Sequence, residues 1–404
     1  MFSASAEAPT LPQELIHAVI GCVAASKDHP SLRQCALSHR CMLQESQRHL
    51  FAEIVLELPL WPSALDSRAG GSTVAQRLFE VLQRSTHLAA YIRGLNIVEH
   101  SHRRPASRRP LCYGFAGESV LSKIMPMLCN LVTLALVCAG GSRIPDAFVD
   151  SLTLPSLQRL SIYGARISPH VLNVLPSLRE LRCSNVAWVA SDSFTSRAPT
   201  RLMTGLQRLE LCGVHLDTCK GMIKFFASEA SCHLAHLVHL DVVELDIPYA
   251  LLNALLRHCK DTLQYLHFYG LVNYLDPLNA DLSILPVLRE LNIVFMDPNH
   301  THIYDAQWSF VFQWLKSVHP LRRLALRLCF DPTSDTLTRD AKEWKILDDL
   351  LGSSHKKFAQ VDFYNDDCEE PVIERALPRA RESLGSNLRL CVRKEPINFF
   401  PVYR

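Results

Sequence analysis

A six-residue pattern, Leu-x-x-Leu-x-Leu or a close variant of it, recurs ten times along this chain of 404 residues. The copies begin at Ile92, Leu131, Leu157, Leu178, Leu206, Leu237, Leu263, Leu288, Leu321 and Phe358. Their starting points are 21 to 39 residues apart, most often 25 to 33. Repeats of this length each form one supersecondary unit, which buries its apolar face only against its neighbours. The pattern therefore predicts a solenoid from about residue 90 onward.

The segments between these copies, the returns that lead from one strand to the next, have the apolar periodicity of helices. Apolar residues spaced three and four apart predict helices at 145–152, 169–175, 217–230, 248–259, 307–318 and 339–351. A doubly wound α/β sheet would also alternate strands and helices. Ten similar motifs without a glycine-rich strand-to-helix turn favour the α/β repeat instead.

The residues between the motif leucines predict a binding surface. Side chains alternate along a strand, so when the leucines point into the core, the intervening residues face the other side. We select nine of them as candidate substrate-binding residues: Tyr163, Arg182, Arg208, Asp241, Tyr265, His267, Tyr269, Asn292 and Arg327. Tyr and Arg are enriched at binding hot spots. The alternative is that these side chains are merely solvent-facing residues of a strand.

These repeats resemble the leucine-rich-repeat family, which implies a curved α/β solenoid with its binding face on the concave, strand-lined side. The resemblance is incomplete at one position. Three residues after the last motif leucine, where the family has Asn or Cys, this chain carries mostly Ala, Val, Leu or Met and has a Cys only at Cys329. The asparagine ladder between coils is therefore missing, and we expect an irregular, degenerate horseshoe.

The first fifty residues predict three short helices. Thr10 and Gln13 have capping-box spacing, with Pro12 in the first turn. Apolar residues at a helical period follow from Leu15 to Val23, a second helix opens at Asp28, and a third runs from about Gln44. So small a module usually completes its core against a neighbour. One interpretation is an N-terminal cap on the solenoid.

Residues 9–56 also resemble an F-box of the type common in fungal proteins. The matching segments are Leu11-Pro12-x-Glu14-Leu15-Ile16, the run from Cys35 to Arg40, and Arg48-His49-Leu50-Phe51 followed by Ile54-Val55-Leu56. The chain departs from the family at Met42, where a tryptophan is usual, and at His39, where a cysteine is usual. The resemblance implies an apolar surface that binds a Skp-type linker protein, formed by Leu11, Pro12, Leu15, Ile16, Ile20 and Leu37. It also divides the chain into an F-box-like module at 9–56 and a solenoid at 57–404.

Composition limits the classes of partner and compartment. The formal net charge is only +2, from 42 basic and 40 acidic residues, so no overall field favours nucleic acid or an anionic membrane. The 14 cysteines are scattered without any Cys-x-x-Cys, which predicts reduced thiols in the cytoplasm or nucleus. We expect no secretory signal and no membrane span, because the apolar runs fall short of about 18 residues.

The sequence contains none of the common phosphate-binding, nucleophile-elbow or zinc-protease motifs, so we expect neither catalysis nor a cofactor. His100 and His102 lie among arginines, which oppose a metal dication. We expect the basic stretch at 100–109 to be a solvated insertion, with a weak nuclear-import or phosphate-contact patch as the alternative, and the acidic residues at 366–370 to form a solvated turn. The aromatic segment at 399–403 could serve as a cap or a binding tail.

Together, these features predict a substrate adaptor of a cullin–RING ubiquitin ligase. The helical module would bind the Skp-type linker, the repeats would bind a protein substrate, and no homo-oligomer is required. The principal alternative is a repeat scaffold unconnected to ubiquitin. A third class, an enzyme with an unrecognised site, would require a deep pocket with convergent acids.

Overall fold

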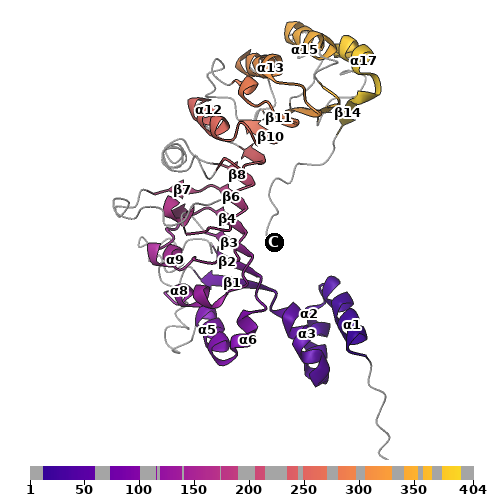
Figure 1. Ribbon diagram of the computed structural model, residues 1–404. Helices are drawn as coiled ribbons and strands as arrows, with labels where there is room; N and C mark the ends of the chain where they lie inside the picture. The colour runs from indigo at the N-terminus through magenta and orange to yellow at the C-terminus, as the bar shows by residue number, and fades with distance from the viewer. Residues whose placement is uncertain are drawn as a thin grey trace, which may run out of the picture. The chain divides into compact units, whose positions relative to one another are not determined.

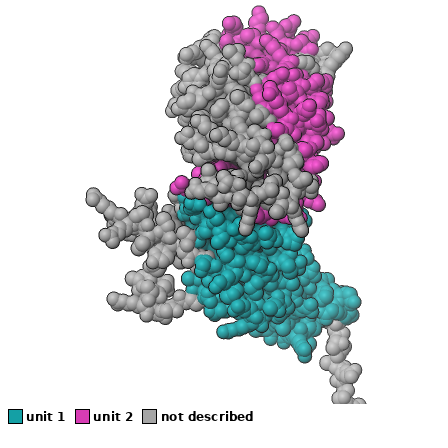
Figure 2. All heavy atoms as spheres, turned by 60° about the vertical axis from the view of Figure 1, so that its left-hand side comes forward, with its two compact units in different colours: residues 1–161 teal, residues 162–404 magenta. Residues whose placement is uncertain are grey.

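The computed structural model describes residues 12–59, 73–100, 115, 119–138, 141–172, 174–189, 205–213, 234–243, 249–270, 281–296, 305–329, 341–353, 358–365 and 375–392. The statements below concern these residues. The chain divides into two compact units, residues 1–161 and 162–404 (Figure 2).

The dominant element is a parallel sheet in which strand order equals chain order (Figure 1). Its twelve described strands are β1 (Glu53–Pro59), β2 (Gly94–His100), β3 (Thr133–Val137), β4 (Arg159–Tyr163), β6 (Glu180–Ser184), β8 (Arg208–Cys212), β9 (His239–Val243), β10 (Tyr265–Gly270), β11 (Glu290–Met296), β12 (Arg323–Cys329), β13 (Val361–Asn365) and β14 (Leu388–Val392). Two short strands, β5 (Arg166–Ile167) and β7 (Ala187–Trp188), pair separately. All ten sequence motifs coincide with strands, so the α/β repeat prediction is confirmed at this level.

Motif leucines fix the register of the sheet. Leu209, Leu240, Leu266, Leu291 and Leu324 pair in one row across β8 to β12. All five are at most 1% exposed. A one-residue slip of any strand would turn its leucines to the opposite face, and burial of each such side chain stabilises by about 1.5–3 kcal/mol. The apolar pattern therefore determines the strand pairing.

Helices fill the returns, as predicted. They are α5 (Val74–Arg84), α6 (Thr86–Ala89), α8 (Leu121–Ile124), α9 (Asp146–Asp150), α12 (Tyr249–His258), α13 (Asp305–Ser317), α15 (Ala341–Ser353) and α17 (Pro378–Leu384), with 3-10 turns η1 (Met125–Met127), η2 (Pro169–Leu172), η3 (Leu282–Ile284) and η4 (Gly385–Asn387). The helix predicted at 217–230 lies outside the described residues. Trp314 of α13 packs edge-on against Phe268 of β10, with ring centroids 5.2 Å apart. This contact attaches α13 to the leucine side of the sheet.

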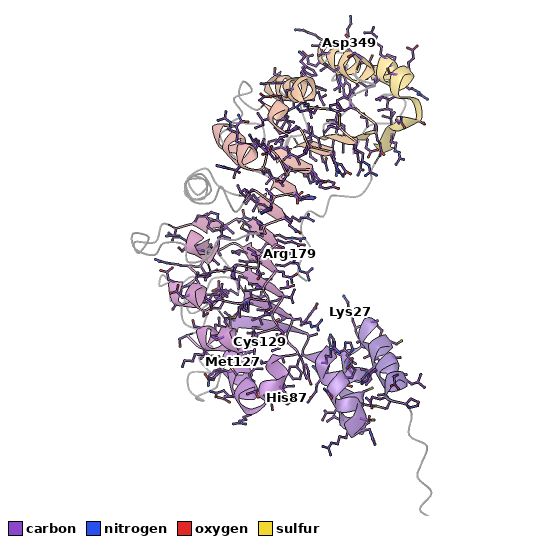
Figure 3. The ribbon with its side chains drawn as sticks, in the orientation of Figure 1. Lys27, His87, Met127, Cys129, Arg179 and Asp349 are labelled. Carbon is purple, nitrogen blue, oxygen red and sulfur yellow. The ribbon has the colours of Figure 1, made fainter. Side chains whose placement is uncertain are left out.

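The last two helices are joined by a buried carboxylate. Asp348 of α15 is 4% exposed, and its oxygens accept hydrogen bonds from the backbone N–H groups of Arg379 (3.1 Å) and Ala380 (2.8 Å). These groups open α17 and have no partner within their own helix. The neighbouring Asp349, labelled in Figure 3, lies on the exposed side and pairs with the guanidinium of Arg379. Asp348 therefore caps α17 from another helix.

Three consecutive coils turn through the same backbone conformation. Gly164, Asn185 and Gly213, which directly follow β4, β6 and β8, all have φ between 52° and 62°. Their N–H groups donate to the carbonyls of Ser184, Cys212 and Val243 on the next strand. Such φ values favour glycine, and asparagine tolerates them best among the other residues. We refer to these three residues as the left-handed column.

Gly213→Ala should therefore destabilise unit 2 through two separate effects. The left-handed conformation costs an L-residue about 1–2 kcal/mol, and the added Cβ would overlap the side chain of Asn185. Gly141→Ala is the control, because Gly141 also has a positive φ (78°) and its Cβ would meet nothing within 4 Å. We expect chemical denaturation to show a larger loss for Gly213→Ala, with part of it restored by Asn185→Gly. Equal losses for the two alanine variants would contradict the overlap.

The N-terminal helices have a core of their own. They are α1 (Gln13–Ala25), α2 (His29–Ser38) and α3 (Arg40–Leu50). Ile16, Ile20 and Leu32 form the buried centre, and five further side chains pack around it: Val23, Ala24, Cys41, Met42 and Leu50. Met42 thus packs, partly buried, against this core. We call these three helices the helical module.

The ends of these helices differ in part from the sequence prediction. Pro12 is the N-cap of α1 and no side chain caps it, while Thr10 lies outside the described residues. Asp28 caps α2 as expected by accepting from Ser31 N–H. The third helix begins at Arg40 rather than near Gln44, because His39 Nδ1 accepts from the backbone N–H of Cys41. Since β1 already pairs with β2, the predicted boundary at 56/57 lies within a strand of the sheet.

Candidate protein-binding surface

The intervening residues of unit 2 form ordered rows across the sheet. The first row contains Glu180, Arg208, His239, Tyr265, Glu290 and Arg323, which pair in register from β6 to β12. The second row, two residues further along each strand, contains Arg182, Glu210, Asp241, His267, Asn292, Ala325 and Asp362. The third row contains Ser184, Cys212, Val243, Tyr269, Val294 and Arg327.

Asp241 is the centre of the densest polar cluster in these rows. Its Oδ2 accepts from Arg208 Nη2 at 2.9 Å, and its Oδ1 lies 2.9 Å from His239 Nε2 and 3.4 Å from His267 Nδ1. The ring of His239 also stacks on Tyr265, with centroids 5.5 Å apart. We call Arg208, His239, Asp241, Tyr265 and His267 the Asp241 cluster. Each strand contributes its residues by simple alternation, because first- and second-row positions share a face.

The environment of Asp241 keeps its carboxylate ionised. Burial alone would raise its pKa, but hydrogen bonds from His239 and His267, together with the charge of Arg208, outweigh burial and lower the pKa below the ordinary value of 3.8. A buried carboxylate with several donors is a common case of such a shift. The cluster is therefore a charged, hydrogen-bonded arrangement at neutral pH.

Asp241→Asn should lower stability at neutral pH by about 2 kcal/mol, because the amide loses the charge-assisted bond from Arg208. The folded-state pKa lies below the unfolded one, so the ionised group stabilises above the unfolded pKa and loses this contribution as pH falls through the folded value. Urea denaturation at pH 7 and pH 3 should thus show a stability difference from wild type that shrinks in acid. Glu210→Gln, at the more exposed Arg182 pair, is the control and should change little. A pH-independent difference would contradict this assignment.

A second carboxylate repeats the geometry four strands away. Arg323 Nε donates to Asp362 Oδ2 at 2.6 Å, and Gln360 Nε2 donates to both oxygens of the same carboxylate at 2.9 and 3.1 Å. Arg323 and Gln360 occupy the positions that Arg208 and His239 occupy relative to Asp241. A first-row arginine thus reaches a second-row aspartate on the next strand in both places.

The third row corrects part of the predicted surface. Cys212, Val243, Tyr269 and Val294 form a buried apolar cluster, and Arg327 is only 5% exposed. Tyr269 and Arg327 are therefore not available as surface contacts, and Asp241 is accessible only through its neighbours. Alternation correctly assigns these residues to one side of the strands. It does not reveal that the side chains of these third-row positions, near the ends of the strands, are buried.

The remaining predicted residues keep accessible side chains. Tyr163, Arg182, Arg208, Tyr265, His267 and Asn292 are each half-buried. The structure brings Arg208, Tyr265 and His267 together around Asp241, and Asn292 is paired in register with His267. Alternation along the strands assigns two further residues to the same surface, although neither is among the nine selected: His239, which holds Asp241 and stacks on Tyr265, and Arg323. The signal for His239 was its position two residues before Asp241 on one strand.

Three large apolar side chains are exposed on the helical module. Leu15 is 53% exposed, Val19 60% and Leu37 82%. Leu15 and Val19 are one turn apart on α1 and therefore share a face. We call Leu15 and Val19 the apolar patch; Leu37 is a further exposed apolar residue, on α2.

The predicted linker-binding set changes accordingly. Ile16 and Ile20, predicted to contact the linker, are 7% and 1% exposed and belong to the module's core. The phase of α1 turns these two side chains inward and leaves Leu15 and Val19 exposed to solvent. Pro12 is exposed, and Leu11 lies outside the described residues.

Comparison with known proteins adds little to this picture. No protein-family model matches the chain, and no curated protein matches it. Among solved structures, one match is the crystal structure of a mouse RP105/MD-1 complex, at 15% sequence identity and a TM-score of 0.29. The alignment covers 87% of this chain and 66% of that chain, just under two thirds of its length. The chain has a leucine-rich-repeat-like fold. This fold is seen in the parallel sheet, whose strand order equals the chain order and whose motif leucines pair in register.

The other candidate sites from the sequence do not form a second functional site among the described residues. No group of three or more His, Cys, Asp or Glu side chains that could hold a metal ion occurs there. His102, the basic insertion, the acidic residues at 366–370 and the aromatic segment at 399–403 lie outside it. Burial raises the pKa of the Cys183 thiol, and that of Cys259 to about 12, so both stay protonated. The described helices include none that is both long and apolar enough to span a bilayer.

Proposed function

We propose that this chain is a non-enzymatic substrate adaptor of a cullin–RING ubiquitin ligase. The helical module binds a Skp-type linker protein, and the repeat surface binds a protein substrate. The observations that carry the proposal are the apolar patch of α1 and the exposed Leu37 of α2, large apolar side chains left exposed on helices that already have a core of their own. Exposed apolar residues in a group favour a protein interface. They occur here within residues that resemble an F-box.

The mechanism requires no chemistry from the chain itself. A linker bound at one end and a substrate bound at the repeats hold a substrate lysine near a ubiquitin-loaded enzyme. This raises the effective concentration of the two reactants. The adaptor would act in the cytoplasm or nucleus, where such ligases work, and needs no cofactor.

A second candidate function is a repeat scaffold unconnected to ubiquitin. The observation in its favour is the helical module's own closed core, which would allow it to serve simply as the first cap of the array. Parallel repeats need capped ends to remain soluble. In that case the apolar patch would bind a different partner or none.

Co-expression with a Skp-type linker protein, followed by size-exclusion chromatography, separates the two functions. Stable co-elution in a one-to-one complex is expected for the adaptor. A folded chain that elutes alone, while a known F-box protein co-elutes with the same linker, would exclude the adaptor and leave the scaffold.

A further inference from the structure

Cys41 and His39 form a thiol–imidazole pair at the start of α3. The distance from His39 Nδ1 to Cys41 Sγ is 2.8 Å, and the same ring nitrogen lies 3.2 Å from the backbone nitrogen of Cys41. Cys41 is half-buried and His39 is exposed, so the pair is within reach of solvent. A cysteine with a base at hydrogen-bond distance is the arrangement in which a thiol becomes a nucleophile.

The helix cap defines the tautomer of His39. A backbone N–H can only donate, so Nδ1 presents its lone pair to Cys41, and the proton of the neutral imidazole is on Nε2. The same lone pair is directed at the thiol and is the acceptor for its S–H proton. The imidazole therefore has the protonation state that a general base requires.

The position of Cys41 in the fold supports the same chemistry. Cys41 is the second residue of α3, a helix of 11 residues, and the N-terminus of a helix stabilises a negative charge such as that of a thiolate. Gln13 of α1 donates from Nε2 to the carbonyl oxygen of Cys41 at 3.1 Å, which fixes the backbone at this residue. Contacts from two helices of the module thus hold the thiol in place beside its base.

Two other thiols of the same helical module provide internal comparisons. Cys22 of α1 is exposed, and Cys35 of α2 is half-buried like Cys41. Neither sulfur has a hydrogen bond to a side chain in the described part of the chain. Exposure alone would make Cys22 react first, whereas an imidazole base favours Cys41. Burial raises the pKa of three thiols in the solenoid, so that these stay protonated: Cys138, Cys183 and Cys259.

We propose that Cys41 is an oxidative modification site, at which His39 is the general base for attack of the thiol on a hydroperoxide. The S–H proton moves to His39 Nδ1, and the sulfur attacks the terminal peroxide oxygen as the O–O bond breaks. The leaving oxygen takes the proton from the imidazolium. The hydroperoxide is thereby reduced to an alcohol or water, and Cys41 is oxidised to a sulfenic acid.

The oxidation rates of the individual thiols in the full chain test the proposal. The reduced chain is treated at pH 7 with limiting hydrogen peroxide in the presence of dimedone, which traps sulfenic acids. Peptide mass spectrometry then measures the labelled fraction of each cysteine over time. We expect Cys41 to be labelled about tenfold faster than Cys22 and Cys35, because general-base assistance outweighs the difference in exposure.

Two variants separate the base from the helix cap. His39→Asn keeps a side-chain acceptor at the N-cap, where asparagine is among the preferred residues, but removes the base. Labelling of Cys41 should slow about tenfold in this variant, while that of Cys22 stays constant. His17→Asn is the matched control, because it removes an exposed imidazole that is hydrogen-bonded to Gln13 in the same module and leaves the pair intact. It should be labelled at the wild-type rate.

Three results would overturn the inference: labelling of Cys41 no faster than that of Cys22 and Cys35, an unchanged rate in His39→Asn, or an equal loss in both variants, which would assign the effect to packing of the module. The inference goes beyond the proposed function and fails separately from it, because the reaction is measured on the chain without any linker protein. A chain that co-elutes with the linker but shows no preference for Cys41 remains an adaptor. A chain that oxidises at Cys41 but elutes alone loses the ubiquitin connection and keeps this site.

Discussion

Replacement of Leu15 and Val19 by glutamate should abolish co-elution with a Skp-type linker protein while leaving the chain folded. Both side chains are more than half exposed, so the free protein tolerates the change. In a complex the same positions would place two charges in an apolar interface, where an unpaired charge costs several kcal/mol. We expect affinity to fall more than a hundredfold.

The matched control is Gln44→Glu with Arg48→Glu on α3. Both positions are exposed, and they have the same spacing of four residues as Leu15 and Val19. This pair adds at least as much negative charge to the module without touching the apolar patch. Co-elution should survive in it. Ile16 is unsuitable for such a test, because a charge at a core position would unfold the module and remove binding for an uninformative reason. Loss of the complex in both variants would indicate general electrostatic repulsion and would count against the patch.

Asp348→Ala should destabilise the C-terminal end of unit 2 by about 2–4 kcal/mol. The substitution removes a side chain that satisfies two N–H groups at the start of α17, and one of them, on Ala380, is fully buried. Loss of a helix cap costs about 0.5–2 kcal/mol, and a buried donor left without a partner adds about 1–3 kcal/mol. Urea denaturation monitored by circular dichroism should show the loss.

Asp349→Ala provides an adjacent control in the same helix. Asp349 is 44% exposed and pairs with a largely exposed Arg379, and exposed ion pairs contribute little. A stability close to wild type is expected for this variant. If the two alanine substitutions destabilise equally, the effect belongs to helix α15 itself and not to the cap on α17.

The sequence predicted the sheet better than the surfaces it carries. The leucine motif predicts the strand positions, because only one register of the strands buries side chains such as that of Leu240. The outer strands β1 and β14 were not recognised as repeats, since the edges of an array lack the full motif. The predicted ranges of helices such as α12 and α13 are close to the observed ones, because the apolar periodicity of each helix spans three turns.

The exposed residues of these surfaces were harder to predict than the strands, because the exposure of a side chain depends on packing as well as on alternation along the strand. Leu15 and Ile16 are neighbours with the same apolar character, and only the packing of α1 against α2 and α3 decides which one faces solvent. Likewise, Tyr265 and Tyr269 lie on one face of one strand, yet only Tyr265 remains accessible. The depth of Asp241 beneath Arg208 depends on side-chain geometry across two strands, which no single repeat encodes.

The equality of strand order and chain order has an evolutionary consequence. Each coil touches only the coils before and after it, and the returns already differ in length while the leucine register stays constant. Insertions and deletions can therefore accumulate on the helical side without displacing a single residue of the first row. Such a chain can diverge rapidly in length and on its helical side while the row residues keep their register, so relatives should be sought by comparing the row residues in register and not the whole sequence.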